Sequence, residues 1–128
     1  MLKVGLLGVG HLGKIHLKLL HQSKYYELIG FYDPHFLAPE DLESTFNCSH
    51  FDDYDELLKA VDVIDVVTPT ITHYEMTKKA IENGKHVFIE KPITENLKEA
   101  QSLSQLIQEY NVKGQVGHVE RFNPAFQA

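Results

Sequence analysis

The chain has 128 residues, of which 43% are hydrophobic and 23% are charged. This balance is typical of one folded domain and excludes a disordered or collagen-like chain. The 18 acidic residues outnumber the 12 basic ones, and the formal charge of −6 makes a nucleic acid an unexpected partner. The single cysteine, Cys48, excludes an intrachain disulfide and favours a cytoplasmic location. We expect no membrane segment and no signal peptide, because the N-terminal apolar run is short and is interrupted at Gly5.

Short apolar runs alternate with amphipathic segments along the whole chain. The runs predict strands over residues 2–7, 25–33, 48–51, 63–67, 86–90 and 112–119. The segments between them predict helices over residues 12–22, 39–46, 53–61, 72–84 and 94–110. Asp53, Thr72 and Thr94 are the predicted N-terminal caps of the last three helices. Helical spacing is clearest in two sets of apolar residues: Leu12, Ile15, Leu19 and Leu20, and Leu97, Ala100, Leu103, Ile107 and Tyr110.

Single helices between successive strands indicate βαβ units, whose short crossovers require parallel pairing. Right-handed crossovers then bring helices to both faces of the sheet. The expected fold is therefore α/β, a doubly wound and mainly parallel sheet of about six strands. We expect residues 1–120 to form this domain, and residues 121–128 to begin a connection to something further.

A glycine-rich loop lies between the first predicted strand and the first predicted helix. Residues 8–13 match the pattern G-x-G-x-x-G. Gly8 permits the tight turn, Gly10 lets the backbone approach a pyrophosphate, and Gly13 lets helix and strand pack closely. The backbone at His11 and Leu12 lies at the positive end of the helix, which would face the phosphates. The alternative interpretation is a purely structural glycine-rich turn.

An acidic residue ends the second predicted strand at the spacing that dinucleotide sites use. Asp33 lies 20 residues after Gly13 (33 − 13 = 20), where its carboxylate can accept hydrogen bonds from ribose hydroxyls. A carboxylate there repels a 2′-phosphate, so the sequence favours NAD over NADP. His35 is the one nearby group that could assist a 2′-phosphate, and it is usually neutral at pH 7.

Polar residues follow the fourth and fifth predicted strands, at the sheet edge where doubly wound folds bind ligands. Thr68, Pro69 and Thr70 with His73 follow one strand, and Glu90, Lys91 and Pro92 follow the next. A lysine at such a strand end can transfer a proton or bind a substrate hydroxyl. A solvated Glu90–Lys91 pair in a loop is the alternative interpretation.

The glycine loop, Asp33, the Thr68–His73 segment and the Glu90-Lys91-Pro92 tripeptide together resemble the nucleotide-binding domain of the Gfo/Idh/MocA oxidoreductase family. The resemblance implies that Lys91 lies near the reacting carbon and assists deprotonation of an alcohol. It also implies that Glu90 lines the nicotinamide pocket and that the Lys91–Pro92 bond is cis. Thr68, Pro69, Thr70 and His73 would line the dinucleotide groove.

Residues 117–124 resemble family members that act on nucleotide-activated sugars. His118, Arg121 and Asn123 would then face the nicotinamide or the substrate. Equally, Arg121 could pair with a nearby acid, and Asn123 with the following proline could form a turn. The substrate class implied is a sugar or nucleotide-sugar.

The same resemblance implies a second, α+β domain that this chain lacks. That domain would supply further catalytic residues, most of the substrate pocket and the sheet used for homo-oligomerisation. We therefore expect this chain to bind NAD without turnover. A stand-alone NAD(H)-binding or redox-sensing module is the second hypothesis.

Histidines recur at His11, His16 and His21, but a five-residue spacing spreads them around a helix. We expect them to be surface or loop residues, and the sequence contains no metal-binding pattern of Cys and His.

Overall fold

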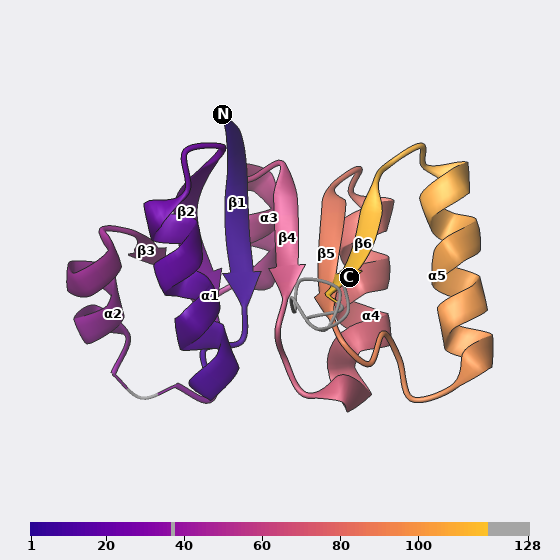
Figure 1. The fold of residues 1–128 in the computed structure, drawn as a ribbon, viewed down its shortest axis with the longest axis horizontal. Coiled ribbons are helices and arrows are strands. Elements are labelled where there is room, and N and C mark those ends of the chain that lie inside the picture. The colour runs from indigo at the N-terminus through magenta and orange to yellow at the C-terminus, as the bar shows by residue number, and fades with distance from the viewer. Residues whose placement is uncertain (37, 118–128) are drawn as a thin grey trace, which may run out of the picture.

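The computed structural model describes residues 1–36 and 38–117. These residues form one six-stranded sheet and five helices (Figure 1). The strands are β1 (Leu2–Leu7), β2 (Tyr26–Tyr32), β3 (Ser49–His50), β4 (Val63–Val66), β5 (His86–Glu90) and β6 (Gly114–Gly117). The helices are α1 (His11–Gln22), α2 (Pro39–Phe46), α3 (Tyr54–Ala60), α4 (Thr70–Glu82) and α5 (Leu97–Glu109).

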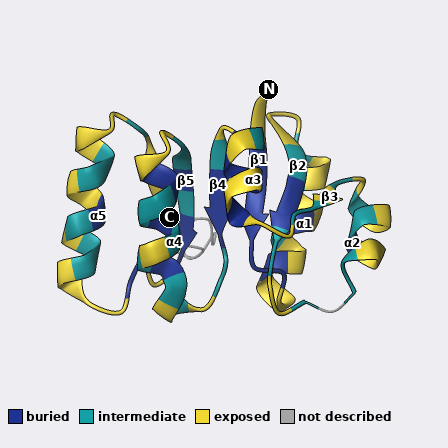
Figure 2. Ribbon diagram, turned by 180° about the vertical axis from the view of Figure 1, so that it is seen from behind, coloured by how far each residue is buried: buried dark blue, intermediate teal, exposed yellow. Residues whose placement is uncertain are grey.

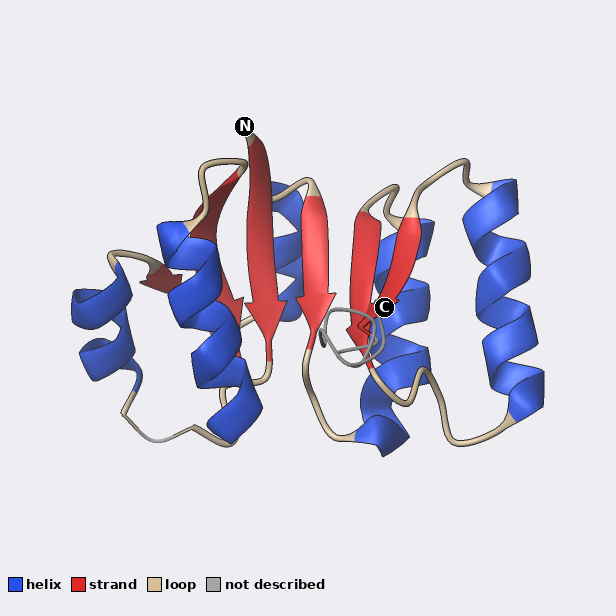
Figure 3. Cartoon of the chain, viewed as in Figure 1, coloured by secondary structure: helices blue, strands red, loops and turns tan. Residues whose placement is uncertain are grey.

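Every strand pair is parallel, and the strand order is β3-β2-β1-β4-β5-β6. This is the doubly wound order of the Rossmann fold, and the predicted fold class is confirmed. The order reverses between β1 and β4, so the loops after these two strands run to opposite sides at the carboxyl edge of the sheet (Figure 3). In doubly wound folds, ligands bind in the crevice at this point.

Helices cover both faces of the sheet, and alternating strand residues feed the two cores. On β1, Leu6 packs with Leu17 of α1, whereas its neighbour Leu7 packs with the core beneath α3, α4 and α5. We call these two surfaces of the sheet the α1 face and the α4 face. Figure 2 shows the buried residues of the sheet behind α3 and α4. Both faces of the central strand β1 are thus apolar, as is typical of a buried parallel sheet.

The caps of two helices differ from the predictions. Asp53 caps α3 as expected, accepting a hydrogen bond from Asp55 N–H at 2.9 Å. Thr72 does not cap α4, which already begins at Thr70 after Pro69. This helix start has no side-chain cap, and the Thr72 N–H donates to the Pro69 carbonyl at 2.9 Å.

The cap of α5 is Asn96 rather than Thr94. The Asn96 side chain accepts a hydrogen bond from Glu99 N–H at 2.9 Å, and its amide donates to the Glu99 carboxylate at 2.9 Å. Thr94 is buried, and its hydroxyl donates to the Asn96 carbonyl. The reciprocal pair explains the later start, since it satisfies a free N–H of the first turn.

The apolar residues whose spacing predicted α1 do not lie on the buried face of that helix. Gly13 and Leu17 are buried, whereas Leu12, Ile15 and Leu19 are 39%, 44% and 61% exposed. They line a cavity of about 610 Å³ between α1 and the part of the α1 face formed by β4, β5 and β6. The described residues include no helix over that part of the sheet, and no helix among them is long and apolar enough to span a membrane.

Candidate functional site

The glycine loop joins β1 to α1 at the carboxyl edge of the sheet. Gly8 has a φ of +91°, a conformation that L side chains rarely adopt, and a Cβ there would lie 2.7 Å from the Val67 carbonyl oxygen. Its N–H donates to the Tyr32 carbonyl at 3.0 Å. A Cβ on Gly13 would collide with the Gly8 carbonyl oxygen. Both glycines are therefore needed for the loop and for the close approach of α1.

Gly10 differs from these two glycines, because a Cβ added to it would meet nothing within 4 Å. It is exposed and precedes the first turn of α1, which carries no side-chain cap and no acidic residue. The first N–H groups of a helix have no intrahelical acceptor, and here this positive end of the helix dipole directly follows the open space at Gly10. This arrangement fits a pyrophosphate, so the residues present fit a dinucleotide.

Asp33 follows β2 beside this loop. Its carboxylate accepts hydrogen bonds from the N–H of Val9 at 2.9 Å and from the N–H of His35 at 2.9 Å. Each carboxylate oxygen retains a further lone pair, and the side chain is half-buried. These hydrogen bonds orient Asp33 beside the loop, where its carboxylate can still accept hydrogen bonds from two ribose hydroxyls.

The loop after β4 forms the opposite side of the crevice. The Thr72 hydroxyl lies 2.7 Å from the Thr68 hydroxyl and 2.7 Å from the Pro69 carbonyl, and these contacts hold the loop at the start of α4. Thr68 and Thr70 are half-buried, and Pro69 is exposed.

His73 lies beneath that loop, only 2% exposed. Its Nε2 is 2.7 Å from the Thr68 carbonyl oxygen and its Nδ1 is 2.9 Å from the Pro92 carbonyl oxygen. The imidazole thus connects the loop after β4 to the turn after β5. Its place in the structure is under the groove wall rather than on the groove surface.

The turn after β5 contains Glu90, Lys91 and Pro92, and the Lys91–Pro92 bond is cis, as the resemblance implied. Lys91 is exposed at the carboxyl edge of the sheet. It follows β5, which is separated by β4 from β1, the strand that precedes the glycine loop. Glu90 is only 7% exposed, and its side chain lies on the α1 face. At this strand end a buried carboxylate on the α1 face is thus followed directly by an exposed lysine.

A cluster that the sequence analysis missed lies on the α1 face. His16 Nδ1 is 2.7 Å from Asp65 Oδ2, and His16 Nε2 is 3.7 Å from Glu90 Oε2. The prediction that His16 is a surface or loop residue is wrong, because it is half-buried against β4 and β5. An aspartate inside an apolar, β-branched strand was the available signal, since a buried carboxylate requires a partner.

The environment of this cluster shifts the pKa values of both His16 and Asp65. Burial by itself lowers the pKa of His16, but the hydrogen bond and charge of Asp65, with the charge of Glu90, raise it above its ordinary value. Burial raises the pKa of Asp65, and His16 partly opposes that effect.

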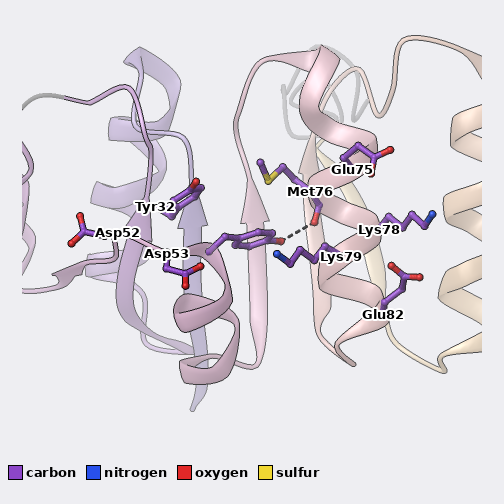
Figure 4. A pocket seen from close by; sticks show the side chains of 9 residues that line it. Tyr32, Asp52, Asp53, Glu75, Met76, Lys78, Lys79 and Glu82 are labelled. Carbon is purple, nitrogen blue, oxygen red and sulfur yellow. Dashed lines mark hydrogen bonds between the residues drawn. The ribbon is translucent and has the colours of Figure 1, made fainter.

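A second cavity, of about 480 Å³, lies between α3 and α4 on the α4 face (Figure 4). The Tyr54 hydroxyl donates to the Met76 carbonyl across it at 2.7 Å, and Lys79 pairs with Asp55 at 2.8 Å. Its lining mixes charges of both signs and includes no free helix N-terminus. It does not match a dinucleotide as the glycine loop does.

The remaining predicted site residues lie outside the described part of the chain. These are His118, Arg121 and Asn123, together with the connection expected over residues 121–128. Within residues 1–36 and 38–117, no group of three His, Cys, Asp or Glu residues could hold a metal ion. Cys48 is half-buried, and burial raises the pKa of its thiol to about 11, so it is unreactive at neutral pH.

Comparisons with known proteins agree with this geometry. The chain is 34% identical to UDP-N-acetylglucosamine 3-dehydrogenase of Acidithiobacillus ferrooxidans over 98% of the chain and 40% of that relative. The solved structure of that enzyme superposes with a TM-score of 0.91. The chain is also 37% identical to scyllo-inositol 2-dehydrogenase (NAD(+)) of Bacillus subtilis, over 97% of the chain and 37% of that relative.

A third relative has been solved with its cofactor. Scyllo-inositol dehydrogenase of Lactobacillus casei, with bound NAD(H) and scyllo-inositol, is 28% identical and superposes with a TM-score of 0.90 over 99% of the chain and 39% of that structure. The chain thus spans about 40% of the length of the relatives it matches.

A family profile described as "Oxidoreductase family, NAD-binding Rossmann fold" matches residues 2–118, which is nearly the whole chain. The open cradle at Gly10, the oriented Asp33 and the cis Lys91–Pro92 turn all lie within that match. The chain belongs to the Gfo/Idh/MocA oxidoreductase family and forms its NAD-binding Rossmann domain.

Proposed function

We propose that this chain is the cofactor-binding part of an NAD-dependent dehydrogenase that oxidises a secondary alcohol of a sugar or nucleotide-sugar. The observation that carries the proposal is the uncapped start of α1 beside the open space at Gly10, where a diphosphate fits. The named activities of the relatives, which include a nucleotide-sugar dehydrogenase and inositol dehydrogenases, support the substrate class.

Asp33 gives the proposed site its preference for NAD. The carboxylate is held toward the loop by the Val9 N–H, where it would accept from the adenosine ribose hydroxyls. A 2′-phosphate in that place would meet a negative charge at short range. We expect NADP to bind more weakly for this reason.

Lys91 is the proposed catalytic residue. Its exposed position at the carboxyl end of β5 suits an ammonium group that binds the substrate hydroxyl and relays its proton. NAD⁺, when bound, would accept the hydride. Thr68, Pro69 and Thr70 would line the groove, and His73 would support it from beneath through its contacts with both loops.

A second domain completes the proposed enzyme. The 610 Å³ cavity beside α1 is lined by exposed Leu12, Ile15 and Leu19, and Gly117, the last residue of β6, also lines it. An apolar surface of this kind suits burial against further protein. We propose that the rest of the polypeptide covers it, supplies the substrate pocket and mediates homo-oligomerisation, so that this chain alone binds NAD without turnover.

The test is a calorimetric titration of the chain with NAD⁺ and with NADP⁺. Saturable binding of NAD⁺, at least about tenfold tighter than NADP⁺, is the expected result, equivalent to about 1.4 kcal/mol. Equal affinities would remove the role given to Asp33. An absence of binding to either dinucleotide would remove the proposed function.

A further inference from the structure

The cluster of His16, Asp65 and Glu90, here the His16 cluster, joins three elements on the α1 face. His16 comes from α1, Asp65 from β4 and Glu90 from β5. The imidazole lies between the two carboxylates, at 2.7 Å from Asp65 and 3.7 Å from Glu90. Side-chain exposures of 14%, 6% and 9% show that water screens these charges only weakly.

When Asp65 and Glu90 are both ionised, only the protonated form of His16 suits both neighbours. Ionised carboxylates accept hydrogen bonds but cannot donate them, and a neutral imidazole carries a single N–H. With a neutral ring, two buried carboxylates would face each other across an uncharged group. The imidazolium offers an N–H to Asp65 and a positive charge to Glu90, which compensates both. Asp65 Oδ2 makes the contact with His16, whereas Oδ1 has no hydrogen-bond partner among the described residues, so His16 is the main stabiliser of that carboxylate.

The surroundings of Glu90 are shaped to hold its carboxylate beside His16. A Cβ on Gly117 would lie 2.6 Å from Glu90 Oε2 and 3.0 Å from the Phe88 ring, so β6 leaves room there only because residue 117 is glycine. The Phe88 ring lies 6.1 Å from the His16 ring, at a tilted angle. The carboxylate is therefore confined by β6 on one side and by α1 on the other.

Among the described residues that line the cavity with His16, Asp65 and Glu90, the one further titratable side chain is Tyr26 of β2. Beside the two carboxylates, β1 contributes Val4, β5 contributes Phe88, and β6 contributes Gln115 and Gly117. The charge state of His16 within the described chain is thus governed by Asp65 and Glu90.

We propose that His16 is a positioning residue, whose imidazolium fixes the carboxylate of Glu90 and so the corner formed by Glu90 and Lys91. His16 lies on the helix whose N-terminus is the phosphate cradle, and Glu90 directly precedes the proposed catalytic lysine. The ion pair therefore couples the two ends of the cofactor site. This inference rests on the proposed function, in which that corner contacts the nicotinamide.

The first experiment needs no ligand. The ring signals of His16, assigned by their loss in His16→Gln, are followed by NMR against pH. In the unaltered chain the pKa should lie above the ordinary histidine value, and Glu90→Gln should lower it. Asp65→Asn should lower it as well, but that variant removes a buried group and could unfold the chain, so Glu90→Gln decides. An unchanged titration in Glu90→Gln would overturn the coupling.

The second experiment compares NADH with ADP-ribose, which lacks the nicotinamide. His16→Gln should weaken NADH binding about tenfold, the effect of one lost interaction with a charged group, and change ADP-ribose binding less than twofold. His21→Gln, an exposed histidine on the same helix, is the matched control and should change neither. Equal losses for both ligands would mean that α1 has moved as a whole, which would overturn the positioning role.

Gly117→Ala tests the same corner from the other side. It should displace Glu90 and weaken NADH but not ADP-ribose, whereas Gly114→Ala on the same strand pushes only against the flexible end of Ile107. Unchanged NADH binding in Gly117→Ala would count against the inference. If the unaltered chain bound ADP-ribose but not NADH, the nicotinamide role would fall. If it bound neither, the proposed function itself would fall, while the pH titration would still decide the coupling.

Discussion

Gly10 and Gly13 stand three residues apart in one loop, yet substitutions at these positions should have opposite effects. In Gly10→Val the new Cβ enters open space, and the backbone at φ −69° and ψ −162° is acceptable to any residue. The helix loses no cap hydrogen bond, because Gly10 makes none. The change in unfolding free energy should stay below about 1 kcal/mol, a shift of at most roughly 5 °C in the melting temperature.

The effect of Gly10→Val on binding should be large. The valine side chain fills the path along which a diphosphate reaches the first N–H groups of α1. Hydrogen bonds to a charged group contribute about 1.5–3 kcal/mol each, so the loss of two of them weakens NAD at least about hundredfold. Gly13→Ala, in contrast, drives a Cβ into the Gly8 carbonyl and should destabilise the fold by about 1–3 kcal/mol or more.

The two effects are measured by urea unfolding and by calorimetric titration with NAD⁺ on the same samples. The expected pattern is a stable Gly10→Val that does not bind, beside an unstable Gly13→Ala. A Gly10→Val chain with unaltered affinity would show that no diphosphate occupies the loop. A strongly destabilised Gly10→Val would show that the space at this residue is not open.

Three further outcomes follow from the contacts. Asp33→Asn should lower the ratio of NAD⁺ to NADP⁺ affinity about tenfold, measured by parallel titrations, and an unchanged ratio would exclude the ribose contact. The raised pKa of His16 stabilises the fold below its ordinary value of 6.5, and this contribution disappears as pH rises through the folded-state pKa. Urea unfolding between pH 5.5 and 8.5 should therefore show stability falling with pH, more steeply than in His16→Gln, and parallel profiles would contradict the ion pair. Asn96→Ala should lower the free energy of unfolding by about 1 kcal/mol, measured by urea unfolding beside Asn83→Ala, which changes another exposed asparagine. A loss no larger than that of Asn83→Ala would mean that the α5 cap contributes little.

The sheet was predictable because its central strands are apolar runs and the segments between the strands have helical periodicity. Residues 86–90 and 39–46, for example, were predicted with the observed bounds. The caps of α4 and α5 were harder, because Thr72 and Thr94 are good cap residues by type. Which residue caps a helix depends on the direction from which the chain enters it, and that direction is set by Pro69 and by the turn after β5.

The dinucleotide side of the site was also predictable, because glycines and an acid at fixed spacing reflect the local geometry of one βα unit. The His16 cluster was not, because Asp65 lies 49 residues after His16 along the chain and Glu90 lies further still. The spacing of His16 with His11 and His21 indicated a scattered surface set. Only the fold, in which the His16 side chain reaches from α1 to β4 and β5, brings an imidazole between two carboxylates.

The hydrogen bond from Val9 N–H to Asp33 ties the phosphate loop to the end of β2 before any ligand arrives. A loop held in this way loses little conformational entropy on binding, since most of its ordering is completed during folding. Asp33 therefore holds the loop in place in addition to its proposed discrimination between NAD and NADP. Its removal should slow the association of pyrophosphate-bearing ligands in general, because the loop would then have to be ordered by each incoming molecule.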